Sequence, residues 1–294
     1  MSATTAELPI LARPIPTVLT EDCARSLTIA TEDGYSLAAT LWTAPQSRAV
    51  ALIAPATGVP HGFYRRFARH LNAGGLDVLS FDYRGMSASR GPRSMRDPGL
   101  TMWNWGTRDL VAAIAEAERL AAGRPLVYVG HSFGGQALGL ASNASRVERA
   151  LFVGSQHGWM GHWPWHQRAL LAFLWKLALP ATTRLFGRFP SSLFGMGESL
   201  PREVALQWAS WCSRREHLGA WEGHADLRLP ILSLSFDDDF FAPRIATAAL
   251  LREYASADVE HRHFPAEGLG HFGFFRGGRV LALWDDAVRF LQAP

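Results

Sequence analysis

The sequence contains few cysteines and almost no lysine. Its two cysteines, Cys23 and Cys212, lie far apart among 294 residues, so there is no disulfide framework of the kind that small secreted domains need. Lysine occurs once, at Lys176, among 29 basic residues, and the formal net charge is only +3. The arginines are scattered singly or in pairs and form no basic stripe, so we expect no nucleic-acid partner.

Targeting and membrane-spanning features are also missing. The first twenty residues lack a basic start followed by an apolar run, so we expect no signal peptide. No uncharged stretch of the sequence reaches the ~20 residues that a membrane-spanning helix requires. The sequence therefore predicts a soluble, cytoplasmic protein.

Motifs for metals and phosphate-bearing cofactors are absent as well. The closely spaced histidines are His157 with His162 and His166, and His261 with His263, and neither group matches a recognised ligand set. No glycine-rich phosphate loop is present. We expect no metal and no cofactor.

The composition that remains is that of an ordinary globular protein, with 48% hydrophobic and 19% charged residues. Two runs of alternating apolar residues, 26–31 and 35–43, flank the dipeptide Asp33-Gly34. This pattern predicts a β-hairpin at the start of a sheet.

From residue 49 onward, continuous apolar runs alternate with amphipathic helical periodicity. Such runs are typical of parallel strands that are covered on both faces. The sequence predicts an α/β fold with a mostly parallel, eight-stranded sheet and helices on both faces. After the hairpin we expect strands at 49–54, 76–81, 126–129, 150–153, 230–236 and 259–264, and helices near 64–73, 101–122, 134–143, 244–254 and 278–291.

The alternation stops between residues 155 and 226, a stretch that holds seven of the eleven tryptophans. About seventy residues are too many for a plain loop, so we predict a helical cap inserted between two parts of the core, 1–154 and 227–294. The cap could simply extend the core. Because ligands bind at the corresponding edge of open α/β sheets, we interpret it as a lid over an apolar pocket.

The cap contains an apolar run at 168–188 with four basic residues, a composition that could touch a membrane surface. Pro180 interrupts this run and the polar face is thin. The sequence therefore does not favour membrane contact.

The sequence Gly130-His131-Ser132-Phe133-Gly134 lies between a predicted strand and a predicted helix. A serine on such a sharp turn needs small residues two positions before and after it, so that strand and helix can approach each other. The dipole of the following helix favours negative charge at this point. We predict Ser132 as a catalytic nucleophile; the alternative is an idle serine in a glycine-rich turn.

A serine nucleophile needs a base and an acid, which in this arrangement follow it in the order acid, then histidine. Three carboxylates, Asp237, Asp238 and Asp239, follow the predicted strand 230–236. Asp239 is our first choice for the acid, followed by Asp238 and Asp237 as alternatives. Two of the three are expected only to cap the next helix.

For the base we predict His271, which lies between Gly270 and Gly273 after the next strand. His261 and His263 alternate within that strand, so we interpret them as ordinary strand side chains. The oxyanion donors are predicted to be the backbone N–H groups of Phe133 and of Thr57, with Ala56 as the alternative to Thr57.

With these residues in place, the chain resembles the α/β-hydrolase superfamily, near the serine aminopeptidase and monoglyceride lipase branch. The resemblance runs from about residue 27 to the C-terminus and rests on the motifs at 54–59, 81–89, 130–134, 237–239 and 270–275. Two departures are visible. Pro55-Ala56 stands where many relatives carry His-Gly, and Ser87 replaces the second glycine of the pattern Asp-x-Arg-Gly-x-Gly-x-Ser.

The resemblance implies hydrolysis of an ester or related acyl bond through an acyl-enzyme on Ser132, His271 and Asp239. The partner would be a small acyl substrate, and the aromatic cap suggests that it is partly apolar. An acyltransferase or peptidase on the same residues remains open, because four glutamates of the cap could hold an ammonium group: Glu198, Glu203, Glu216 and Glu222. A non-catalytic ligand-binding protein is the third reading.

Overall fold

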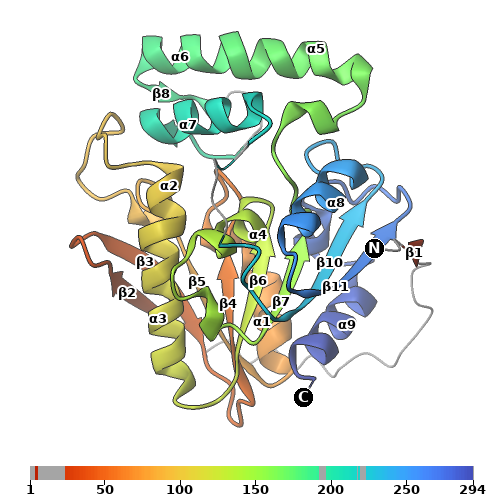
Figure 1. Cartoon of the computed structure of the whole chain (residues 1–294). Helices are drawn as coiled ribbons and strands as arrows, with labels where there is room; N and C mark the ends of the chain where they lie inside the picture. Colours follow the sequence, from red (N-terminus) through yellow and green to blue (C-terminus); the bar gives the residue numbers. More distant parts are fainter. Residues whose placement is uncertain (1–3, 6–23, 192–196, 217, 219–222, 294) are drawn as a thin grey trace.

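A twisted sheet with helices on both faces carries the site, and a helical insertion lies above one end of it (Figure 1). The computed structural model describes residues 4–5, 24–191, 197–216, 218 and 223–293. The strand order is β1-β11-β10-β7-β6-β4-β5-β3-β2. The strands are β1 (Thr4–Thr5), β2 (Ala24–Ala30), β3 (Ser36–Trp42), β4 (Ala49–Ala54), β5 (Leu76–Phe81), β6 (Leu126–His131), β7 (Arg149–Val153), β10 (Pro230–Phe236) and β11 (Asp258–Phe264).

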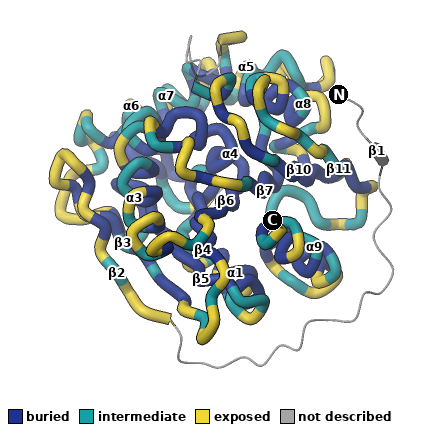
Figure 2. The backbone as a smooth tube through the Cα atoms, turned by 60° about the horizontal axis from the view of Figure 1, so that its bottom comes forward, coloured by how far each residue is buried: buried dark blue, intermediate teal, exposed yellow. Residues whose placement is uncertain are grey.

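The predicted fold class is confirmed. Strands β2 and β3 form the expected antiparallel hairpin, and β3 also pairs antiparallel with β5, whereas the other pairs are parallel. The eight predicted strands are all present, and the two-residue strand β1 adds a ninth at the edge of β11. Every residue of β4, β5 and β6 is buried (Figure 2), because helices cover both faces of the sheet, and this is why these strands read as continuous apolar runs.

Helices cover both faces of the sheet. Helices α1 (Arg65–Ala73) and α9 (Leu281–Leu291) pack on one face. Helices α3 (Leu110–Ala121) and α8 (Arg244–Glu253) pack on the other. The helix predicted at 101–122 is α2 (Met102–Asn104) joined to α3 through a π-helical turn, η3 (Trp105–Asp109).

The helix predicted at 134–143 is too long. Helix α4 (Phe133–Ala137) passes into a short 3₁₀ turn, η4 (Leu138–Leu140), and the backbone at Ala141 is extended. Glycines at 134, 135 and 139 lower the helix propensity of this segment. The space around Gly139 is also closed, because a Cβ there would lie 2.2 Å from the ring of His224.

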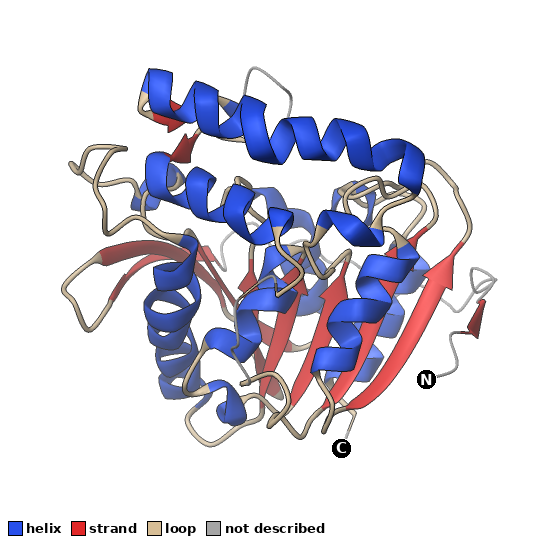
Figure 3. Cartoon of the chain, turned by 45° about the horizontal axis from the view of Figure 1, so that its top comes forward, coloured by secondary structure: helices blue, strands red, loops and turns tan. Residues whose placement is uncertain are grey.

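The helices between β7 and β10 lie above the carboxyl ends of the strands (Figure 3). We call residues 155–226 the helical insertion. It contains one long helix, made of α5 (Trp165–Phe173), a π-helical turn η7 (Leu174–Ala178) and α6 (Leu179–Phe186), and a second helix α7 (Arg202–Ser213) beneath it. The expectation that this stretch has no strands is wrong in one detail, since β8 (Arg188–Phe189) pairs with β9 (Leu200–Pro201).

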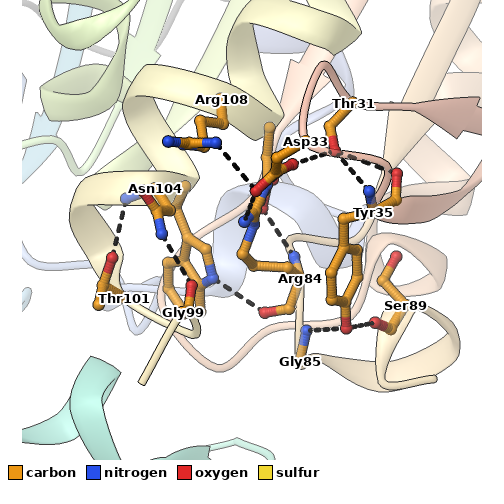
Figure 4. A network of polar contacts seen from close by, with 12 residues as sticks. Thr31, Asp33, Tyr35, Arg84, Gly85, Ser89, Gly99, Thr101, Asn104 and Arg108 are labelled. Carbon is orange, nitrogen blue, oxygen red and sulfur yellow. Dashed lines mark hydrogen bonds and ion pairs between the residues drawn. The ribbon is translucent and has the colours of Figure 1, made fainter. Parts of the chain in front are cut away.

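A buried ion-pair network fastens the segment that follows β5 to the β2–β3 turn (Figure 4). The Arg84 guanidinium donates to Asp33, at 2.8 Å, and to Asp109, at 2.7 Å. The backbone N–H of Arg84 donates to the same Asp109 carboxyl. Burial raises the pKa of Asp109 to about 7, against the opposing charge of Arg84. Tyr35 completes the network, because its hydroxyl donates to the Ser89 carbonyl and accepts from an amide N–H of the segment.

Candidate active site

Ser132 lies on the tight turn between β6 and α4. Its backbone has φ +52° and ψ −113°, a conformation that non-glycine residues rarely adopt and that surrounding structure must hold in place. A Cβ on Gly130 would lie 2.6 Å from the nitrogen of Gly135, and one on Gly134 would lie 2.3 Å from the carbonyl oxygen of Ala54. Both positions therefore require glycine, for the steric reason that the sequence pattern indicates.

Ser132 and His271 line the same small cavity beneath the helical insertion. The cavity measures about 30 Å³, which is room for roughly two water molecules. Its walls also include the two candidate residues of the oxyanion loop and four side chains that sequence reasoning missed. The complete lining is Ala56, Thr57, Ser132, Gln156, Trp208, Phe241, His271 and Phe272.

Of the missed side chains, Phe272 lies within the motif at 270–275, whereas Trp208 and Gln156 lie in no motif that could have marked them. In the sequence, Trp208 is only one of many tryptophans. In the structure, it reaches the cavity from α7 of the helical insertion. Gln156 lies just beyond β7, the strand next to that of the serine. The one available signal for Gln156 is its place after a predicted central strand, where ligand-binding residues gather in α/β folds.

His271 is held by Asp239. The distance from Nδ1 of His271 to Oδ2 of Asp239 is 2.7 Å, and the Asp239 side chain is fully buried. The Asp239 carboxylate also accepts the backbone N–H groups of Phe241 and Ala242, at 2.8 and 2.9 Å. These contacts place the proton on Nδ1 of His271 and leave Nε2 as the nitrogen that can accept a proton.

The competing acids and histidines lie elsewhere. Asp237 is 59% exposed and accepts a hydrogen bond from His263, at 2.6 Å. His263 and His261 both contact the hydroxyl of the buried Ser235, at 2.7 Å each. In the described part of the chain, no hydrogen bond joins Asp238 to His271. Asp239 is therefore the only one of the three carboxylates that the described contacts bring to His271.

A second chain of hydrogen bonds connects the loop after β4 to the loop of His271. The backbone N–H of Ala56 donates to the Tyr64 hydroxyl, at 2.9 Å, and that hydroxyl donates to Nδ1 of His131, at 2.8 Å. The other ring nitrogen of His131 donates to the backbone carbonyl of His271, at 2.9 Å. Burial, and secondarily the charge of His271, holds the pKa of His131 well below its usual value, so His131 is neutral, as this donor and acceptor pattern requires.

The same hydrogen bonds distinguish Ala56 from Thr57, the two candidates for the second oxyanion donor. The N–H of Ala56 is already used by Tyr64, so it cannot also point at a substrate oxygen. Thr57 follows it in the loop and lines the cavity.

The described glutamates among those considered for a peptidase, Glu198, Glu203 and Glu216, do not line this cavity. Glu198 accepts the backbone N–H of Ser87, at 2.9 Å, and Glu203 pairs with Arg202. Glu222 lies outside the described residues. No carboxylate of the described chain lines the cavity.

The structure also accounts for the departure at Ser87. Its φ is +39°, so this serine adopts the left-handed backbone that the glycine of the pattern would adopt freely.

The described residues contain no group of three or more potential metal ligands.

Comparisons with known proteins identify the family of this chain. The sequence profile of the alpha/beta hydrolase family matches residues 51–283. No curated protein matches the sequence.

Many solved structures share the fold. A soluble variant of monoglyceride lipase from Saccharomyces cerevisiae is 15% identical, with a TM-score of 0.71 over 95% of this chain and 98% of that one. An esterase from Exiguobacterium antarcticum is 15% identical, with a TM-score of 0.62 over 92% and 100% of the two chains. A carboxyl esterase from Bacillus coagulans is 11% identical, with a TM-score of 0.62 over 91% and 97%.

Proposed function

Because this chain belongs to the alpha/beta hydrolase family, we propose that it is a serine hydrolase that cleaves a carboxylic ester through an acyl-enzyme. The observation that carries the proposal is the buried Asp239–His271 hydrogen bond at the same cavity as Ser132. A serine on a strained strand-to-helix turn, beside a histidine whose other nitrogen is held by a carboxylate, is the arrangement that activates a hydroxyl for acyl transfer.

In this proposal Ser132 attacks the ester carbonyl while Nε2 of His271 takes the hydroxyl proton. Asp239 holds the imidazolium that forms, and its carboxylate accepts hydrogen bonds from two backbone N–H groups and from the histidine. The N–H groups of Phe133 and Thr57 bind the oxyanion. His271 then returns the proton to the leaving alcohol, and a water molecule attacks the acyl-enzyme by the same route in reverse.

The cavity lining favours an ester over an aminoacyl substrate. It is mostly aromatic and small apolar side chains, with Gln156 as an added polar group. A peptidase that acts on free N-termini needs a carboxylate within reach of the ammonium group, and the described lining of the cavity contains none. The leading substrate class is therefore an acyl ester with an uncharged acyl group.

The test is labelling by a fluorophosphonate probe, which reacts only with an activated serine. We expect labelling of the wild-type protein and its loss in Ser132→Ala, with ester hydrolysis reduced by about 10⁴-fold or more. Ser235→Ala is a matched control, because Ser235 also contacts two histidines but is fully buried; its removal should leave labelling intact.

Absence of labelling in a folded sample would contradict the proposal and favour a non-catalytic binding protein. A panel of acyl esters, aminoacyl amides and acceptor alcohols then separates the remaining chemistries. Faster cleavage of aminoacyl amides than of esters would indicate a peptidase, and ester product formed only with an added alcohol would indicate an acyltransferase.

A further inference from the structure

The outer face of the long helix α5–α6 exposes large apolar side chains. Among the described residues, six of the nine large apolar side chains that are most exposed lie on this one helix. Trp165 is 81% exposed and Leu185 is 73% exposed. The others are Leu170, Phe173, Leu177 and Phe186. A contiguous apolar surface of this kind marks an interaction site rather than ordinary surface.

The helix is fixed to the protein by its opposite face. Leu171, Trp175, Leu179 and Thr183 recur every four residues and are all buried. Trp175 packs edge to face on Trp208 of α7, with ring centroids 4.7 Å apart. By length and composition Trp165–Phe186 could cross a membrane, but a helix held along its length in this way lies flat on the molecule. In Figure 3 it is the outermost element above the sheet.

Pro180 does not interrupt this helix, contrary to the interpretation of the sequence. Proline lacks an N–H and its ring collides with the carbonyl four residues earlier in a regular α-helix. Here the π-helical turn η7 precedes it, and the N–H of Leu179 donates to the carbonyl of Leu174, five residues back. The wider turn makes room for the ring, so the exposed apolar face is continuous.

The charged side chains of residues 165–188 are all of one sign. Arg168, Lys176, Arg184 and Arg188 are exposed. The sequence contains no Asp or Glu between Glu148 and Glu198. Two copies of this face would bring like charges together, whereas an anionic lipid surface offers both the apolar layer and the opposite charge.

We propose that residues 165–188, the docking face, bind the protein peripherally to an anionic membrane, with the helix in the plane of the interface. The apolar side chains enter the boundary between headgroups and acyl chains, and the four basic residues contact anionic headgroups. The serine cavity lies beneath the same insertion, so docking brings it to a surface rich in apolar esters. The binding itself does not depend on the proposed hydrolase activity.

The test is co-sedimentation of the full chain with vesicles of phosphatidylcholine, alone or mixed with phosphatidylglycerol. The Ser132→Ala variant is used so that no lipid is hydrolysed. We expect binding to the mixed vesicles that weakens as salt is added. The double variant Phe173→Asp/Leu177→Asp should lose at least 10-fold in partition coefficient, and Lys176→Gln/Arg184→Gln about 25-fold, since each cation contributes about 5-fold.

Leu281→Asp is the matched control, because Leu281 is also exposed and apolar (44%) but lies on α9, away from the insertion (Figure 1). It should bind vesicles as the parent does. Equal vesicle binding by Phe173→Asp/Leu177→Asp, or no binding by a folded parent, overturns the proposal. The proposal is also overturned if light scattering shows a dimer in solution that the double variant dissociates, and if no form of the protein binds vesicles.

Discussion

At the scale of single residues, Tyr64 and His131 connect the two halves of the candidate site. The oxyanion loop and the His271 loop come from distant parts of the sequence, and the chain from Ala56 through Tyr64 and His131 to the His271 carbonyl joins them. Tyr64 and His131 touch no substrate in the proposed reaction. We therefore assign them a positioning role.

Tyr64→Phe tests this role. The change leaves the Ala56 N–H and the His131 Nδ1 buried without partners, which should lower the free energy of unfolding by about 2–4 kcal/mol. If the network positions the oxyanion donor, kcat should fall about 10-fold with little change in KM. Ester kinetics below the melting temperature and urea denaturation measure the two effects.

Tyr83→Phe is the control, because the Tyr83 hydroxyl is also buried but has no hydrogen-bond partner in the described chain. Its loss should leave kcat unchanged and stability unchanged or slightly higher. If Tyr64→Phe lowers stability while kcat stays at the wild-type value, Tyr64 is structural only.

Ser87 offers a second prediction at this scale. Its positive φ of +39° strains a residue that has a Cβ, so Ser87→Gly should raise the free energy of unfolding by about 0.5–1 kcal/mol. Ser87→Ala keeps the strain and should give no gain. Thermal unfolding of the three proteins makes the comparison, and equal gains from Gly and Ala would show that the backbone is not strained.

At the scale of elements, helix α7 supplies one wall of the cavity. Trp208 lines the cavity and packs against Trp175 of the outer helix. The Trp208 side chain therefore limits the space above Ser132. A cavity of about 30 Å³ has no room for a long acyl chain unless this wall moves.

Trp208→Ala should therefore change acyl-chain preference. We expect kcat/KM for octanoyl esters relative to acetyl esters to rise about 10-fold, because the truncated side chain leaves space for the longer acyl group. Trp165→Ala is the control, since Trp165 is exposed on the outer helix. An unchanged ratio in Trp208→Ala would show that the acyl chain lies elsewhere.

At the scale of the whole molecule, several buried histidines make stability depend on pH. Burial holds the pKa of His131 well below its usual value and lowers that of His224, and it lowers the pKa of His162 and His261 to about 4. Between about pH 4 and 6.5 the unfolded chain therefore binds protons that the folded chain does not. Asp109, whose pKa is raised to about 7, has the opposite effect.

The histidines outnumber Asp109, so the free energy of unfolding should fall as pH is lowered from 6.5 to 5, by up to about 1.4 kcal/mol per pH unit for each net proton. Urea denaturation at both pH values measures this. Asp109→Asn lowers stability overall but removes the opposing proton, and should steepen the fall. A free energy of unfolding that is constant or rises on acidification would contradict the prediction.

The sequence alone determined the sheet, its mostly parallel order and the placement of Ser132. These features are written in local patterns: apolar runs for strands that are buried on both faces, and Gly130 and Gly134 where any Cβ would meet backbone. The choice of Asp239 and His271 as a pair also came from order along the chain, and the structure brings these two side chains together.

Only the tertiary structure decided what depends on the packing and hydrogen bonding of the folded chain. The early end of α4, the π-helical turn that accommodates Pro180, the pairing of β8 with β9, the Trp208 wall and the use of the Ala56 N–H by Tyr64 all arise in this way. The sequence does not show which groups surround a proline or a backbone N–H donor in the folded protein. The free energy that fixes such features comes from partners elsewhere in the chain, and those partners are set only when the chain has folded.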